Sequence, residues 1–183
     1  MLTIPNLLTL LRLAMTPAAA VLAYSPSAAG RWAAFGVFLA AMLTDVADGL
    51  IARLPGQSSR LGLYLDPVVD KVILLTMFFV LADLGVVPLW MALLMMAREL
   101  VVDGLRSVAA TAGRVVGANV MGKSKAVMQT ACIALGLGLR AIGAEANAAR
   151  LWTTLATGVT LLVAWAFAAV FLWWNRKLLG KQP

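Results

Sequence analysis

The chain has 183 residues, of which 62% are hydrophobic and 13% are charged, and its formal net charge at pH 7 is +7. A soluble domain is about 45–50% apolar and about 25% charged, so this composition indicates a protein embedded in lipid. The positive charge is expected to face anionic lipid head groups, with no nucleic acid as partner. The absence of histidine excludes histidine ligands and bases, and the single cysteine, Cys132, excludes an internal disulfide.

Six apolar segments follow one another along the chain, and each approaches the roughly 20 residues that a transmembrane helix needs. Glycine and proline in the connectors separate them. We therefore predict an all-α polytopic membrane protein with six transmembrane helices, forming a single domain over residues 1–183. The predicted segments are Leu7–Tyr24, Trp32–Arg53, Leu63–Ala82, Val86–Ala112, Met121–Ile142 and Leu151–Trp174.

The distribution of lysine and arginine predicts the orientation of these helices. If both termini lie on one side, the opposite side holds only three basic residues, Arg31, Arg140 and Arg150. Cytoplasmic loops carry an excess of lysine and arginine, so we expect both termini in the cytoplasm. The basic residues counted on the terminal side are Arg12, Arg53, Arg60, Arg114, Lys123, Lys125, Arg176, Lys177 and Lys181.

Four carboxylates stand out in the second and third apolar segments: Asp45, Asp48, Asp66 and Asp70. One charge near the centre of a membrane helix costs at least about 2.5–3.5 kcal/mol, so this cluster requires compensation by positive charge, protonation or water. Hard divalent cations prefer carboxylate oxygens, which predicts a site for one or two metal ions. A proton or ion pathway is the alternative, because acids within a membrane also mark transporters.

Helical spacing brings these aspartates together. The first two share one face of the second segment, and the last two share one face of the third. The short connector makes these helices antiparallel neighbours, so their acidic ends are expected to meet at the cytoplasmic surface. Asp66 precedes Pro67, so this residue alone could instead be a helix N-cap.

Four other residues near the aspartates suit a bulky phosphate-bearing ligand. Gly49, Ala52 and Gly62 lie on the same helix faces and leave room for it. Arg53 supplies a planar fork of donors that matches phosphate.

The stretch from Asp45 to Asp70 reads D-x2-D-G-x2-A-R-x8-G-x3-D-x3-D, and it resembles the signature of the CDP-alcohol phosphatidyltransferases at every fixed position. The segments IPNLLTLLRL, ARELVVDGLR and GANVMGKSKA resemble the branch of this family that makes phosphatidylglycerophosphate in bacteria. The resemblance covers the chain up to about Ala134.

The resemblance implies a six-helix fold in the bacterial cytoplasmic membrane, usually as a homodimer, with the active site open to the cytoplasm. It implies two divalent ions, Mg²⁺ or Mn²⁺, with Asp45, Asp48 and Asp66 as ligands. Asp70 would be the general base and a further ligand. The implied CDP-binding residues are Gly49, Ala52, Arg53 and Gly62. Asn6 and Thr9, with Arg12, are further candidates for nucleotide contacts, or else belong to an amphipathic start at the interface.

The implied reaction transfers the phosphatidyl group of CDP-diacylglycerol to glycerol 3-phosphate and releases CMP, by direct displacement. Other acceptors in the family would give cardiolipin, phosphatidylinositol phosphate or phosphatidylserine, and an ion-coupled transporter is a remote alternative. Four basic residues are candidates for holding the acceptor phosphate: Arg98, Arg106, Lys123 and Lys125. The two arginines could instead pair with Glu99 and Asp103 inside the bundle, and the two lysines could instead anchor to lipid phosphates.

Overall fold

The computed structural model describes residues 4–51, 60–111 and 120–179, and these ranges form helices joined by short turns, with no strand among them. The predicted all-helical fold is therefore confirmed. Six helices lie close to the predicted segments, and the last extends five residues beyond its predicted end at Trp174. The helices are α1 (Ile4–Ala23), α2 (Ala28–Ile51), α3 (Arg60–Asp83), α4 (Leu89–Thr111), α5 (Val120–Ala141) and α6 (Ala146–Leu179).

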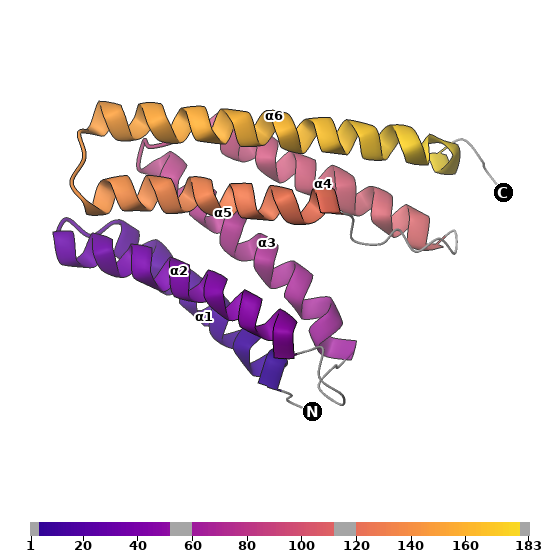
Figure 1. Cartoon of the computed structure of the whole chain (residues 1–183), viewed down its shortest axis with the longest axis horizontal. Coiled ribbons are helices and arrows are strands. Elements are labelled where there is room, and N and C mark those ends of the chain that lie inside the picture. The colour runs from indigo at the N-terminus through magenta and orange to yellow at the C-terminus, as the bar shows by residue number, and fades with distance from the viewer. Residues whose placement is uncertain (1–3, 52–59, 112–119, 180–183) are drawn as a thin grey trace.

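The third helix, α3, occupies the middle of the bundle. It packs against α1 on one side and against α4 and α5 on the other. The first two helices, α1 and α2, lie side by side at one edge, and α6 runs along α5 at the opposite edge (Figure 1). Because α3 contacts three helices, side chains on its different faces can serve more than one site.

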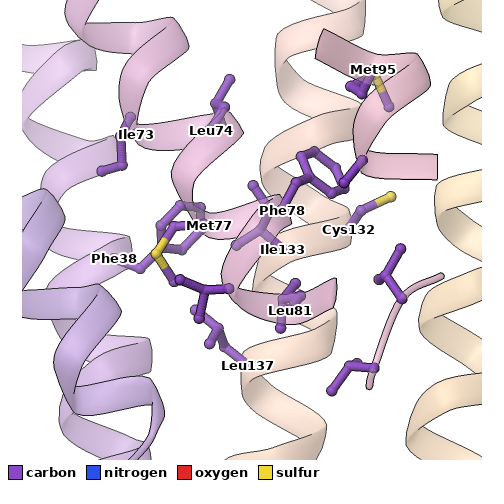
Figure 2. Packing of buried hydrophobic residues seen from close by; sticks show 14 of the residues in the cluster. Phe38, Ile73, Leu74, Met77, Phe78, Leu81, Met95, Cys132, Ile133 and Leu137 are labelled. Carbon is purple, nitrogen blue, oxygen red and sulfur yellow. The ribbon is translucent and has the colours of Figure 1, made fainter. Parts of the chain in front are cut away.

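The core uses large apolar side chains from the middle helices and small ones where helices approach closely. Phe38, Met77 and Ile133 are completely buried and come from α2, α3 and α5 (Figure 2). Ala19 and Ala34 are also completely buried, on α1 and α2. Small residues let helix backbones approach in lipid, where apolar contact alone does not drive association.

The outer surface of the bundle carries large apolar side chains. Val21, Leu43, Val127 and Leu162 are each at least 68% exposed and lie on four different helices. Water would disfavour so much exposed apolar surface, whereas lipid tails match it. This surface indicates a membrane-bound protein.

Two helices in the described part of the chain are long and apolar enough to cross a membrane by length and composition. They comprise Asn6–Ala23 in α1 and Ala146–Trp174 in α6. The helices α3, α4 and α5 each carry several charged residues along their length. Six membrane crossings therefore remain a prediction.

A glycine on α5 allows close packing between three helices. A Cβ atom at Gly136 would lie 3.0 Å from Cδ1 of Leu81 on α3 and 3.1 Å from Cγ2 of Thr153 on α6. We expect Gly136→Val to destabilise the fold by about 1–3 kcal/mol, because the added methyl groups must displace both neighbours. Thermal unfolding followed by circular dichroism in detergent measures this loss. Gly104→Val on α4 is the matched control, since no atom lies within 4 Å of the Cβ position there; equal losses would contradict the packing argument.

Candidate active site

One arginine joins three helices in the half of the bundle where α1 and α3 begin and α2 ends. The side chain of Arg12, on α1, is completely buried. Its Nη1 lies 2.9 Å from Oδ1 of Asp45 on α2 and 2.6 Å from Oδ1 of Asp70 on α3. The two carboxylates are 47% and 39% exposed, so each also faces outward from the bundle. A single guanidinium nitrogen thus holds two acids from separate helices side by side.

A second contact ties α1 to the start of α3. The hydroxyl of Thr9 donates a hydrogen bond of 2.5 Å to Oδ1 of Asp66. Asn6, Thr9 and Arg12 recur every three residues along α1, and all three are buried. This face of α1 therefore orients two of the carboxylates of α3, Asp66 and Asp70.

Only some of the other residues predicted for the site lie in the described part of the structure. Asp48 and Gly49 belong to α2, but the side chain of Asp48 is outside the described part. Ala52 and Arg53 lie outside the described residues, and Gly62 is buried near the start of α3. Asp66 is the seventh residue of α3, which begins at Arg60, so the alternative that it caps this helix is wrong.

The aspartates are also the predicted metal ligands. Among the described side chains, no group of three or more acids is arranged to hold a metal ion. The chemistry of the set nevertheless fits a hard divalent cation, because Asp45 on α2 and Asp66 and Asp70 on α3 offer carboxylate oxygens. In the present arrangement Arg12 supplies the positive charge between two of them.

A cavity of about 170 Å³ lies beside the aspartates, between α3, α4 and α5. We call it the basic pocket, because its wall includes Lys71, Arg106 and Lys125. Asp70 also lines it, so this carboxylate lies between the Arg12 contact and the pocket. The other lining residues are Pro67, Leu74, Leu75, Glu99, Ala126 and Gln129.

Ion pairs hold both lysines of the basic pocket. Lys125 on α5 donates to the buried carboxylate of Glu99 on α4, which also accepts from Gln129 at 3.4 Å. Lys71 on α3 pairs with Asp103 on α4. These pairs connect the three helices that enclose the cavity.

Arg106 differs from the two lysines. It forms no ion pair with any described residue, and its guanidinium lies 6.0 Å from the centre of the Phe171 ring. An arginine without a carboxylate partner keeps its planar fork of donors for an anion. Arg106 is therefore the cation of the pocket wall best suited to a phosphate.

The predicted acceptor-phosphate residues do not all reach this pocket. Arg106 and Lys125 line it together with Asp70. Arg98 is buried and points elsewhere, since its Nε donates to the carbonyl of Ala164 on α6 at 3.3 Å and its Nη1 lies 3.3 Å from Glu99. The side chain of Lys123 is outside the described part.

Sequence reasoning missed the roles of Arg12 and Lys71. An isolated arginine within an apolar segment needs an acidic partner, and this requirement could have linked Arg12 to the aspartates. Lys71 shares a helical face with Pro67 and Leu74, at spacings of three and four residues, so helical phasing could have placed it beside the pocket.

The chain belongs to the CDP-alcohol phosphatidyltransferase family, because residues 2–175 match that family. A Bacillus subtilis relative named CDP-diacylglycerol–glycerol-3-phosphate 3-phosphatidyltransferase is 34% identical over 137 residues, covering 68% of this chain and 71% of the relative. A Cereibacter sphaeroides protein of the same name is 32% identical over 165 residues, covering 86% and 75%.

A third relative carries a different name. A Mycobacterium tuberculosis protein, provisionally named a cardiolipin synthase, is 43% identical over 103 residues. That match covers 56% of this chain and 48% of the relative, so the chain spans about half the length of the mycobacterial protein. The family is therefore established, while the names of its members differ in the acceptor alcohol.

Proposed function

We propose that the chain transfers the phosphatidyl group of CDP-diacylglycerol to a hydroxyl of glycerol 3-phosphate, releasing CMP and forming phosphatidylglycerophosphate. The observation that carries this proposal is the position of Asp70, which contacts Arg12 and also lines the basic pocket. A base at this boundary can face the donor lipid on one side and a small phosphorylated alcohol on the other. The family and the names of two relatives support the same reaction.

The aspartate end would receive the nucleotide diphosphate. Asp45, Asp48, Asp66 and Asp70 would hold Mg²⁺ or Mn²⁺, with two ions expected, and when bound these would neutralise charge on the diphosphate and on the departing CMP. Thr9 restrains Asp66 and Arg12 restrains Asp70, so α1 would keep these carboxylates directed toward the donor. The residues proposed to line the CDP site are Asn6, Thr9, Gly49, Ala52, Arg53 and Gly62.

Asp70 would accept the proton of the attacking hydroxyl. With a divalent cation bound beside it, this carboxylate would be a weak base, so the proton would transfer late, as the hydroxyl oxygen bonds to phosphorus. The signature contains no serine, cysteine or histidine at its fixed positions to form a covalent intermediate. Direct displacement of CMP by the acceptor is therefore the simplest path.

The basic pocket would hold the acceptor phosphate, chiefly through Arg106. We expect Arg106→Gln to raise KM for glycerol 3-phosphate about 10–100-fold, because a hydrogen bond to a charged group contributes about 1.5–3 kcal/mol. KM for CDP-diacylglycerol should stay near the wild-type value. Initial rates of CMP release measure both constants, with Arg150→Gln as a control at the opposite end of the bundle. A change confined to the lipid KM would contradict the assignment.

The proposed topology has six membrane-spanning helices, both termini in the cytoplasm and the aspartate end facing the cytoplasm of a bacterial inner membrane. The apolar outer surface and the location of Arg31, Arg140 and Arg150 at the opposite end support this orientation. A homodimer, the usual state in the family, is part of the same proposal.

Cardiolipin synthesis is the second candidate, and the mycobacterial relative favours it. Its acceptor would be phosphatidylglycerol, whose hydroxyl is carried by a lipid. Purified full-length protein in vesicles, supplied with CDP-diacylglycerol and Mg²⁺ or Mn²⁺, distinguishes the two. CMP release with glycerol 3-phosphate supports the first proposal, and release with phosphatidylglycerol alone overturns it in favour of the second.

A further inference from the structure

A second charged cavity lies at the end of the bundle opposite the aspartates. Its volume is about 250 Å³, several times the roughly 30 Å³ that one water molecule occupies in the liquid. It is a partly open cavity that lies where α5 ends and where α2 and α6 begin, beside the turn between α3 and α4. The lining residues are Arg31, Leu84, Gly85, Val86, Arg140, Gly143, Ala144, Ala146 and Ala149. We call this cavity the far pocket.

The charged side chains of the far pocket are both arginines. No carboxylate lines it, and neither Arg31 nor Arg140 forms an ion pair with an acid in the described ranges. Glu145 lies between two lining residues in sequence but does not line the cavity. Two positive charges sharing a partly enclosed space are unfavourable without a counter-charge.

Most N–H donors of these arginines have no hydrogen-bond partner among the described residues. Nη1 of Arg31 donates to the carbonyl of Pro26 at 2.8 Å, and Nη2 of Arg140 donates to the carbonyl of Ala23 at 3.4 Å. These bonds satisfy carbonyls at the end of α1 and in the turn that follows it, and each uses one of the five N–H donors that a guanidinium carries. Nε of Arg31 is buried and has no hydrogen-bond partner among the described residues. Support of the α1 terminus therefore explains only a small part of this arrangement.

The backbone around the far pocket adds to its preference for an anion. Helix α6 begins at Ala146 in the cavity wall, so its positive dipole end and first amide groups lie there. Gly85 and Gly143 adopt φ angles of 71° and 72°, which favour glycine and turn the chain tightly beside the cavity. Two guanidiniums and a helix start thus converge on one space.

We propose that the far pocket binds a phosphate group, carried either by an anionic lipid head group or by a free phosphate ion. This site is separate from the aspartates and the basic pocket, and it does not depend on the proposed reaction. In the proposed topology it would lie at the outer surface of the membrane. Its ligand would stabilise the junction of α1, α5 and α6.

Ligand binding to the folded protein raises its unfolding temperature, which provides the test. Purified full-length protein in neutral detergent is titrated with inorganic phosphate or with short-chain phosphatidic acid, at constant ionic strength. The wild type and Arg150→Gln should show a rise in unfolding temperature. In the double variant Arg31→Gln/Arg140→Gln the rise should fall to less than half. Arg150 is a matched control because it is exposed at the same end and does not line the cavity.

A second variant keeps both arginines and tests the same site. Ala146→Glu adds a carboxylate at the first residue of α6, where negative charge favours the helix. This carboxylate should form ion pairs with the arginines. The rise in unfolding temperature with phosphate or phosphatidic acid should then fall as in the double variant. A response to inorganic phosphate would identify a free anion as a ligand, and a response to phosphatidic acid alone would identify a lipid head group. An equal rise in wild type and both variants, or no rise with either ligand, would overturn the proposal.

Discussion

Replacing Asp70 with asparagine should lower kcat by about 10²–10⁴-fold, the usual contribution of a general base. The amide has nearly the same shape as the carboxylate, and its oxygen can still accept the hydrogen bond from Arg12. Unlike the carboxylate, it does not take a proton from the acceptor hydroxyl. Asp45, Asp48 and Asp66 remain as the proposed metal ligands, so we expect binding of CDP-diacylglycerol to remain close to that of the wild type.

This effect is measured as CMP release at saturating substrates, together with equilibrium binding of labelled CDP-diacylglycerol. Asp83→Asn is the matched control, because Asp83 lies on the same helix at the opposite end of the bundle, where it accepts a hydrogen bond from Tyr24 at 2.8 Å. The control should retain wild-type turnover. Near-normal turnover of Asp70→Asn would contradict the assignment of Asp70 as the general base.

Replacing Arg12 with methionine should both destabilise the fold and abolish most activity. The methionine fills similar space but leaves Asp45 and Asp70 without the positive charge between them. Removing one partner from a fully buried ion pair costs about 3–5 kcal/mol, but these two carboxylates are roughly half exposed. Solvent screening therefore reduces the expected loss to about 1–3 kcal/mol. Activity should fall because Asp70 is no longer held at the edge of the basic pocket.

A double-mutant cycle isolates this contact. If Arg12 acts by holding Asp70, the stability lost in Arg12→Met should be smaller in a protein that already carries Asp70→Asn. Arg12→Lys should recover part of the stability, since it restores charge without the planar fork. Thermal unfolding in detergent gives each value. Additive losses, or wild-type activity in Arg12→Met, would contradict the bridging role.

The sequence was sufficient to predict the helices and to single out the aspartates as a candidate site. Long apolar segments interrupted by glycine and proline are a strong local signal, and six helices lie close to where they were predicted. Helical phasing placed Asp66 and Asp70 on one face of α3. It also predicted a site shared with α2, and Arg12 of α1 joins Asp45 of α2 to Asp70 of α3. The prediction that α2 and α3 are direct neighbours is wrong, because among the described residues both helices pack chiefly against α1.

The sequence was less informative about which helix each face meets. Arg98 and Arg106 fall within one broad arc of α4, yet Arg98 reaches a carbonyl on α6 whereas Arg106 lines the basic pocket. Helical period relates residues on the same helix, but the position of neighbouring helices decides their surroundings. The same limit hid the partner of Lys71, because Asp103 belongs to another helix.

The pairing inside the basic pocket bears on the acceptor. Glu99 neutralises Lys125, and Asp103 neutralises Lys71, so the wall carries less net positive charge than its three basic residues suggest. A single available arginine suits one phosphate group of a small acceptor.

The most direct test of this account is the identity of the lipid that the purified chain makes. Vesicles containing the wild-type protein and CDP-diacylglycerol are supplied with glycerol 3-phosphate and a divalent cation, and the products are identified by mass spectrometry. We expect phosphatidylglycerophosphate and CMP in equal amounts, with neither formed by Asp70→Asn above about one hundredth of the wild-type rate. Absence of this lipid from wild-type vesicles that make cardiolipin when given phosphatidylglycerol would contradict the proposed function.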